Sequence, residues 1–191
     1  MPRGMAHAAV GWGSAIASAT MRLDSHLPRH LLDFMFSGRL VSFQDHDERN
    51  YGDGVAQMKA RLDINYNYAM VGNFYTKLDH EERRDGETPI IAKKPVEIWD
   101  SQADVGLVRT VGRLSTLFGV TAQHREFHAV EAFDGTSIPQ SYRDTDIYTS
   151  YAKVKYQISP GYNFLAQVTG LTEQNRGSAT FNRTNKGIDA T

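Results

Sequence analysis

The chain contains no cysteine, no long apolar run and almost no net charge. Without cysteine it can form neither a disulfide framework nor a thiolate zinc site, and it has no cysteine nucleophile. The absence of an apolar run of about 18 residues excludes a transmembrane helix, but not a transmembrane β-barrel, whose strands are apolar on only one side. A net charge of −1 over 191 residues argues against a nucleic-acid-binding protein.

Motifs that could carry chemistry are equally scarce. No Gly-x-Ser-x-Gly sequence is present, and we expect no enzymatic activity. His124, Glu126 and His128 share one strand face, but successive side chains on such a face are about 7 Å apart, which is too far to share one zinc ion easily. The acidic segment 45–50 begins like a calcium loop but lacks the closing glutamate of an EF-hand. We therefore predict no metal site and no cofactor.

The strongest pattern is an alternation of apolar and polar residues from Val55 to Val71. Its even positions are all apolar or aromatic, and most of its odd positions are polar or charged. A helix would scatter these residues over all its sides, so the pattern predicts one long β-strand that turns at Val71–Gly72. Soluble strands usually run to about 5–6 residues, whereas membrane strands need about 9–11 plus their ends. The length therefore favours a membrane strand.

The same alternation recurs along the chain and predicts an all-β protein. Strands are expected after Gly112, after Asp146 and from Tyr162, with weaker candidates at Leu31–Phe43, Asn73–Asp79 and Val96–Val108. Long polar connections alternate with short turns such as Ser159–Gly161, as they do in outer-membrane barrels. We predict an antiparallel up-and-down transmembrane β-barrel with about eight strands present.

The domain organisation is expected to be simple. Residues 1–22 are either the first strand or a degenerate signal-like segment, and residues 23–191 form a single barrel domain. Residues 182–187 look like the approach to another strand. Long charged side chains would also crowd the interior of an eight-stranded barrel. We therefore expect an open sheet that is part of a larger barrel, truncated at its C-terminal side.

Alternation divides the strand residues into two predicted faces. The proposed lumen-facing residues are Lys59, Arg61, Asp63, Asp104, Gln123, Arg125, Lys153 and Lys155. The proposed lipid-facing residues are Leu62, Ile64, Tyr66, Leu114, Phe118, Val154, Tyr156 and Phe164. The lumen-facing set holds five bases and two acids, which predicts a preference for an anionic solute such as an acidic polysaccharide. Tyr66, Tyr68, Tyr156 and Tyr162 are candidates for an aromatic girdle at one membrane boundary.

Several short motifs resemble those of a known family. They are Ser25-His26-Leu27-Pro28-Arg29-His30, the acidic loop at 45–53, His80-Glu81-Glu82-Arg83, Tyr142-Arg143-Asp144 and Tyr156-Gln157-Ile158-Ser159-Pro160-Gly161-Tyr162. Together they resemble bacterial outer-membrane proteins of the beta-barrel porin type 2 family, which are often encoded with exopolysaccharide or capsule systems. The resemblance implies the outer membrane of a Gram-negative bacterium, with membrane lipid and the barrel-assembly machinery as partners. It implies no catalytic or cofactor-binding residue.

Three functions are consistent with this sequence. The first is a passive porin or channel, linked to exopolysaccharide or capsule export. The second is a non-conducting barrel whose loops bind a partner or a surface glycan. The third is a soluble lipocalin-like barrel, whose apolar face would point inward. Conductance separates the first two functions, and dependence on detergent separates both from the third.

Overall fold

The computed structural model describes residues 3–11, 14–25, 27–44, 50–81, 92–175 and 182–190. Almost all of these residues are in β-strands, and none of them forms a helix long and apolar enough to cross a membrane. The strands are β1 (Arg3–Gly11), β2 (Ser14–Asp24), β3 (His30–Phe43), β4 (Tyr51–Asp63), β5 (Tyr68–Glu81), β6 (Val96–Val111), β7 (Leu114–Phe127), β8 (Val130–Glu131), β9 (Ser137–Ile138), β10 (Thr145–Ser159), β11 (Tyr162–Asn175) and β12 (Asn182–Ala190). One 3₁₀ helix, η3 (Ser141–Arg143), precedes β10.

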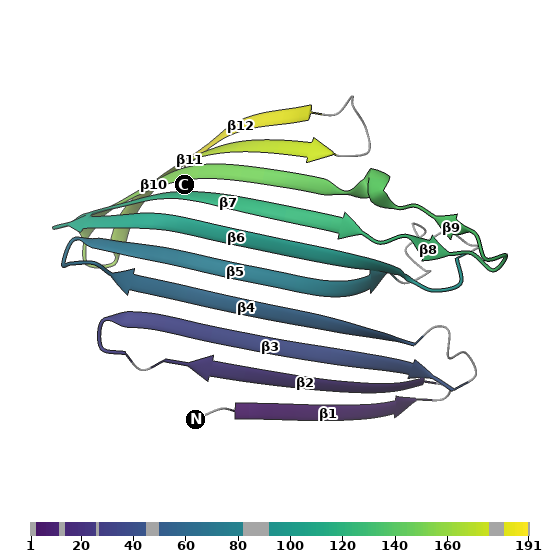
Figure 1. The fold of residues 1–191 in the computed structure, drawn as a ribbon. Coiled ribbons are helices and arrows are strands. Elements are labelled where there is room, and N and C mark those ends of the chain that lie inside the picture. Colours follow the sequence, from purple (N-terminus) through teal and green to yellow (C-terminus); the bar gives the residue numbers. More distant parts are fainter. Residues whose placement is uncertain are drawn as a thin grey trace.

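The main sheet is an antiparallel meander. Its spatial order is β1-β2-β3-β4-β5-β6-β7-β10-β11-β12, and each strand pairs with its neighbours along the chain (Figure 1). The small β8–β9 hairpin is inserted in the connection between β7 and β10. The predicted all-β, antiparallel, up-and-down class is confirmed. The N-terminal segment, expected to be at most one strand, supplies the β1–β2 hairpin instead.

The sheet is open in the described residues. Strands β1 and β12 stand at its two edges, and the strand order contains no pairing between them. This arrangement agrees with the expected open sheet. In a lipid bilayer both edges would need partners, because unpaired backbone N–H and C=O groups are too costly in hydrocarbon.

Connections at the two ends of the sheet differ in length. At one end the strands are joined through 25–29, 64–67, 112–113 and 160–161; at the other, the connections at 44–50, 82–95 and 128–144 are longer. We call these the turn end and the loop end. Gly112 and Gly161 have φ of 57° and 87°, a left-handed conformation in which a side chain would be strained. The predicted turn at Ser159–Gly161 is confirmed, with Pro160 and Gly161 between the two strands.

The prediction of one continuous strand from Val55 to Val71 is wrong. Strand β4 ends at Asp63, residues 64–67 form a turn, and β5 begins at Tyr68. The Asn65 side chain stabilises this turn by accepting hydrogen bonds from the backbone N–H groups of Asn67 and Tyr68, at 2.9 and 3.0 Å. Alternation continues through the turn because paired residues, such as Leu62 and Met70, have the same parity. The turn expected at Val71–Gly72 therefore lies inside β5.

A conventional hydrophobic core is nearly absent from the described residues. The buried apolar cluster consists of Ala92, Val96 and Val130, with Phe127 and Ile138 packed against it, all at the loop end. Most large apolar side chains of the strands are instead exposed. A soluble protein gains most of its stability by burying such side chains, so this sheet requires another apolar surrounding.

Candidate functional site: the two faces of the sheet

Cross-strand pairing assigns each strand residue to one of two faces. Lys59 lies opposite Asn73, Asn73 opposite Asp104, and Asp104 opposite Thr121, so these residues share a face. We call it the polar face, and the opposite side the apolar face. The polar face carries all eight residues proposed to face the lumen, namely Lys59, Arg61, Asp63, Asp104, Gln123, Arg125, Lys153 and Lys155.

Six of the proposed lipid-facing residues lie together on the apolar face. They are Leu62, Leu114, Phe118, Val154, Tyr156 and Phe164. Ile64 and Tyr66 do not belong to a strand face, because both lie in the turn between β4 and β5. The assignment of the two faces to lipid and lumen stays a prediction, but the grouping itself is a property of the structure.

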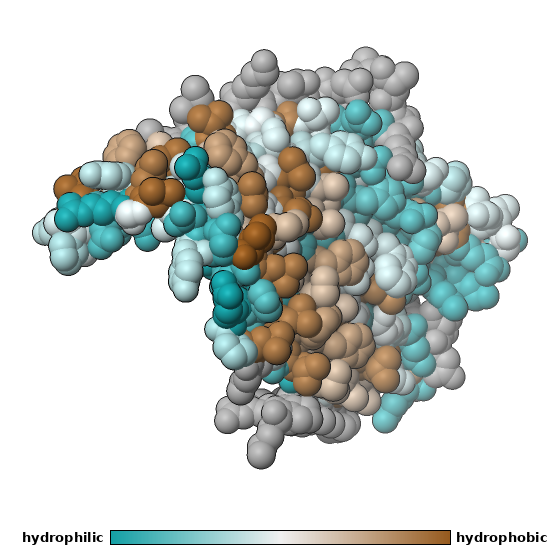
Figure 2. All heavy atoms as spheres, turned by 60° about the vertical axis from the view of Figure 1, so that its left-hand side comes forward, coloured by the Kyte–Doolittle hydropathy of each residue, from teal (hydrophilic) through white to brown (hydrophobic). Residues whose placement is uncertain are grey.

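The apolar face is the more exposed of the two. In the middle of β6, Val105 and Leu107 are 50% and 42% exposed, whereas Gly106 between them is buried and Asp104 is half-buried. Side chains crowd together on the concave side of a curved sheet and spread apart on its convex side, so this difference indicates that the apolar face is convex. Figure 2 shows hydrophobic side chains gathered into a broad patch on one side of the molecule. The arrangement is the reverse of that in a soluble barrel.

Aromatic residues lie near both limits of the apolar face. Tyr68, Tyr156 and Phe164 are near the turn end, and Trp99 is near the loop end. Val111, the last residue of β6, lies twelve residue steps beyond Trp99. At about 3.3 Å per residue this is roughly 40 Å, enough to cross an apolar band about 25 Å thick at a strand tilt of 35–45°. Tyr66 and Tyr162, also predicted for the girdle, lie at the turn end as well.

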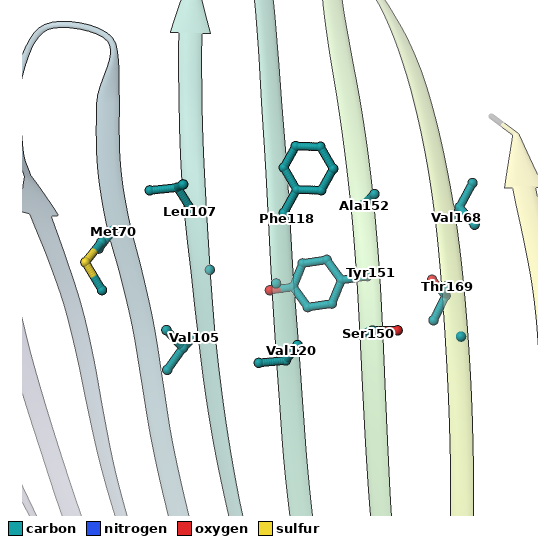
Figure 3. A pocket seen from close by; sticks show the side chains of 13 residues that line it. Met70, Val105, Leu107, Phe118, Val120, Ser150, Tyr151, Ala152, Val168 and Thr169 are labelled. Atoms are coloured by element: carbon teal, nitrogen blue, oxygen red, sulfur yellow. The ribbon is translucent and has the colours of Figure 1, made fainter.

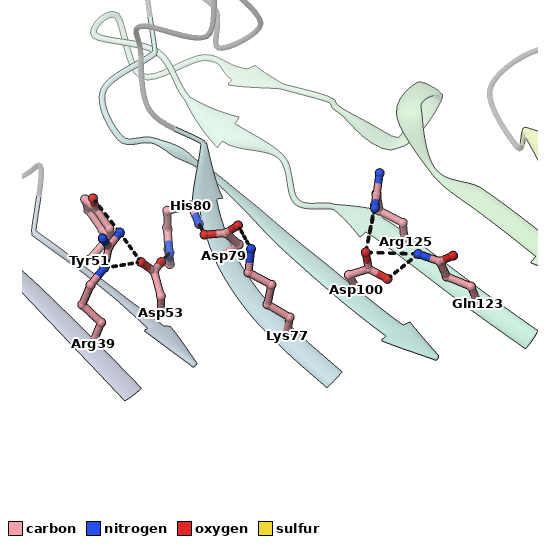
Figure 4. A network of polar contacts seen from close by, with 9 residues as sticks. All are labelled: Arg39, Tyr51, Asp53, Lys77, Asp79, His80, Asp100, Gln123 and Arg125. Atoms are coloured by element: carbon pink, nitrogen blue, oxygen red, sulfur yellow. Dashed lines mark hydrogen bonds and ion pairs between the residues drawn. The ribbon is translucent and has the colours of Figure 1, made fainter. Parts of the chain in front are cut away.

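The polar face is held together by pairs of charged side chains on neighbouring strands. Arg39 on β3 donates hydrogen bonds to Asp53 on β4 at 2.7 and 3.0 Å, and Asp53 also contacts the His80 ring on β5 at 3.1 Å (Figure 4). Lys77 forms an ion pair with Asp79 on the same strand. The contacts extend across three adjacent strands and fix their side chains near the loop end.

A second group of contacts centres on Asp100 of β6. Its carboxylate accepts hydrogen bonds from Arg125 at 2.7 Å and from Gln123 at 2.9 Å, both on β7 (Figure 4). Arg125 and Gln123 were predicted to face the lumen, but their partner was not predicted. Asp100 lies directly opposite Arg125 in the register, a relation that one strand's alternation cannot reveal.

A third group lies in the middle of the polar face. The Tyr151 hydroxyl donates to Asp104 at 2.9 Å, and the Thr121 hydroxyl donates to the same carboxylate at 2.7 Å. The Tyr151 ring lies across Gly119 on the neighbouring strand, where a Cβ atom would collide with it. Gly119 therefore provides the space in which an aromatic ring can lie flat on the sheet and carry its hydroxyl to Asp104.

The loop end of the polar face is closed by a buried ion pair. Arg143 of η3 donates two hydrogen bonds to Glu81 at the end of β5, at 2.8 and 3.1 Å, and its guanidinium carbon lies 4.1 Å from the centre of the Phe127 ring. The two charged side chains are 15% and 6% exposed. The pair ties the 128–144 connection to a strand two positions away in the sheet. Glu81 is the last residue of β5.

The β8–β9 connection beyond this pair is ordered by its own hydrogen bonds. Asp134 accepts hydrogen bonds from the Thr136 hydroxyl at 2.6 Å and the Thr136 backbone N–H at 2.9 Å. These bonds stabilise the charged carboxylate and hold the pKa of Asp134 below its usual value.

The positive charge predicted for the lumen is not present when the polar-face residues of the strands from β2 to β11 are counted together. From β2 to β11 the polar face has eight bases, Arg22, Arg39, Lys59, Arg61, Lys77, Arg125, Lys153 and Lys155, against nine acids, Asp24, Asp33, Asp53, Asp63, Asp79, Glu81, Asp100, Asp104 and Glu173. The net charge is thus 8 − 9 = −1 rather than +3. The eight residues proposed to face the lumen did not include the acids on neighbouring strands, and these acids pair with many of the bases.

Three lysines on the polar face differ from the other bases. Lys59, Lys153 and Lys155 form no ion pair with any carboxylate among the residues that the structure describes. Lys153 lies over the Tyr151 ring, with its ammonium nitrogen 5.2 Å from the ring centre. Lys153 and Lys155 lie in the turn-end half of β10, away from the Asp53 and Asp100 groups.

The histidines of the His124-x-Glu126-x-His128 motif have separate partners. His124 Nδ1 lies 2.6 Å from Asp146, and His128 Nδ1 lies 2.8 Å from Glu97. Among the described residues, no three of His, Asp or Glu are placed so that they could hold a metal ion. The acidic segment 45–50 lies, except for Asn50, outside the described part of the chain.

These features define a class of protein. An antiparallel meander with an exposed apolar face, aromatic residues at the limits of that face and a polar opposite face is typical of the wall of a transmembrane β-barrel. Residues 6–191 match the family described as "Putative beta-barrel porin 2", and the chain belongs to this family. Neither the curated proteins nor the solved structures contain a match to it. A porin family implies an outer-membrane location, and its description names a pore rather than an enzyme.

Proposed function

We propose that this protein forms a passive channel across an outer membrane, with the polar face as the channel wall. The observation that carries the proposal is the exposure pattern of β6, where the apolar side chains are spread outward and the polar ones are crowded inward. The pattern also disfavours a soluble lipocalin-like barrel, in which the apolar face would be enclosed.

A channel requires the sheet to close. Closure could join β1 to β12 or add further strands between them, and in both cases the polar face would line the interior. The width of a barrel grows with its number of strands, and about eight strands leave only enough room for side chains. A barrel of ten or more strands has a wider interior, which favours a water-filled channel over a packed core.

The net charge of the polar face is −1, but the unpaired Lys153 and Lys155 lie together in its turn-end half and favour an anionic solute there. Lys153 and Lys155 project from the same face of one strand and make no ion pair among the described residues. A low-dielectric bilayer around a pore strengthens the field of such fixed charges and raises the local concentration of anions. An acidic polysaccharide or its fragments would suit this wall. We therefore propose that the protein is linked to exopolysaccharide or capsule export through the passage of such a solute along the channel.

Planar bilayer recordings test both levels of the proposal. The full chain should give stepwise conductance, and reversal potentials across a salt gradient should show anion preference. The double variant Lys153→Gln/Lys155→Gln should conduct but lose that preference, whereas Lys93→Gln, in a connection at the loop end, should keep it. Absence of conductance would instead support the non-conducting barrel. Cation selectivity of the unmodified protein would reject the anionic solute but would leave the channel proposal standing.

A further inference from the structure

A furrow of about 930 Å³ crosses the apolar face. Its floor consists of small residues, including Ser150, Ala152 and Gly170, and Phe118 and Val168 stand on either side of Ala152 (Figure 3). A second hollow of about 530 Å³ shares Val105, Val120, Ser150 and Gly170 with it and continues toward the loop end. The convex, apolar side of the sheet is therefore not smooth but has an elongated apolar depression over β6, β7, β10 and β11.

One cation lies beside the turn-end limit of this furrow. Arg109 is exposed on the apolar face of β6, one row closer to the turns than Leu107. Its cross-strand neighbours are Tyr68 and Thr116, and its guanidinium carbon is 5.6 Å from the centre of the Tyr68 ring. Among the described side chains of the main sheet, it is the only lysine or arginine on the apolar face, and it has no carboxylate partner there.

An unpaired guanidinium at the limit of an apolar surface needs an anion. Arginine recognises phosphate through two parallel hydrogen bonds, and the neighbouring Thr116 hydroxyl can supply another donor. A free phosphate ion would use only the cation and leave the furrow empty. A phospholipid presents a phosphate and an acyl chain in one molecule, and this matches both the charge and the apolar depression next to it.

We propose that Arg109, Thr116 and the furrow form a binding site for an anionic glycerophospholipid. The phosphate would lie against Arg109 at the turn end, and an acyl chain would occupy the depression over Ala152 and Ser150, between Phe118 and Val168. The inference rests on the membrane placement in the proposed function, but it does not depend on conduction.

Lipid retention by the full chain tests this site. The protein is refolded into vesicles of phosphatidylcholine and phosphatidylglycerol, extracted in mild detergent, and its retained phosphatidylglycerol is counted by mass spectrometry. A basic residue at a membrane surface contributes about 1 kcal/mol, so Arg109→Gln should lower phosphatidylglycerol retention about fivefold. Lys155→Gln removes the same charge from the polar face and should leave retention unchanged. Ala152→Phe fills the furrow and should reduce retention of both lipids.

Four results would overturn the proposal. Equal retention by Arg109→Gln and the unmodified protein would remove the phosphate site, and equal loss in Lys155→Gln would show only general charge attraction. If inorganic phosphate bound to Arg109 without displacing any lipid from the unmodified protein, Arg109 would be a site for the free ion rather than for a lipid. A change from dimer to monomer in Ala152→Phe, with lipid retention intact, would make the furrow an interface between two copies. A protein that binds the lipid but does not conduct would leave this inference standing and reject the channel.

Discussion

The two faces of the sheet share every backbone hydrogen bond and differ in what stabilises their side chains. On the apolar face, large side chains such as Phe118 and Val120 are each 60% exposed and touch few other parts of the chain. On the polar face, carboxylates such as Asp100 and Asp104 are held by residues of neighbouring strands. One face thus depends on the surrounding solvent and the other on the register of the sheet.

This difference implies that substitutions on the two faces will respond to different variables. Substitutions on the apolar face should change stability only when the protein is in lipid. The size of the change should depend on the depth of the residue in the bilayer. Substitutions on the polar face should change stability to an extent that depends on which neighbouring side chain loses its hydrogen-bond or ion-pair partner, whatever the surrounding solvent.

The largest effect is expected where the polar face is most buried. Arg143→Met removes the two hydrogen bonds that the guanidinium donates to the buried Glu81 carboxylate, and a buried ion pair that loses one partner is typically destabilised by about 3–5 kcal/mol. Denaturant unfolding of the protein in lipid vesicles would measure this loss. The double variant Glu81→Gln/Arg143→Met removes both charges and should recover much of the stability. A cost as small as that of an exposed pair, such as Arg61–Asp63, would contradict the buried role.

A charge in the middle of the apolar face should have the next largest effect. Val120→Arg is expected to cost about 2–4 kcal/mol in lipid, because it places a cation near the bilayer midplane. The matched variant Thr149→Arg, on the polar face of the adjacent strand, should cost much less. Leu62→Arg lies nearer the turn end and should fall between them, with Asp63→Asn as its mild neighbour. Equal costs for Val120→Arg and Thr149→Arg in a lipid refolding assay would mean that the faces are assigned wrongly.

The smallest of these effects concerns the space under Tyr151. Gly119→Ala places a methyl group where the ring now lies, and overpacking of this kind costs about 1–3 kcal/mol. The ring must move, and the hydrogen bond to Asp104 should be lost with it. Gly54→Ala is a suitable control, since the nearest atom to its Cβ would be 3.9 Å away. Equal stability of the two variants would show that Tyr151 does not depend on Gly119.

The class of fold could be predicted from the sequence because alternation is a local property. Period-two patterning around Val55, Leu114 and Tyr148 requires no knowledge of neighbouring strands, and it grouped eight residues that the structure places together on the polar face. The turn at 64–67 was missed for a related reason. An even-numbered turn preserves the parity of the chain, so Asn65 and Asn67 read as the polar side of a continuing strand.

The site was harder to predict because it depends on register. Arg125 was recognised as a polar-face residue, but only cross-strand pairing shows that Asp100 lies opposite it. Likewise, nothing local to Gly119 indicates that a tyrosine on β10, which follows β8, β9 and η3 in the chain, will cover it. The net charge of the wall was misjudged because it is a sum over all strands, and the acids that balance it are on strands whose patterns are weak.

The meander has a consequence for the way in which the sheet forms. Because spatial order follows chain order, every pairing from β1 to β12 joins strands that are close in sequence; in the described residues, the β8–β9 hairpin and η3 are inserted between β7 and β10. Contacts between nearby residues cost little loop-closure entropy and tend to form quickly. The sheet can therefore grow one strand at a time, each new strand docking on the exposed edge of the last. Closure of the two outer edges is then the only step that must bring distant parts of the chain together, and it is expected to be the slow one.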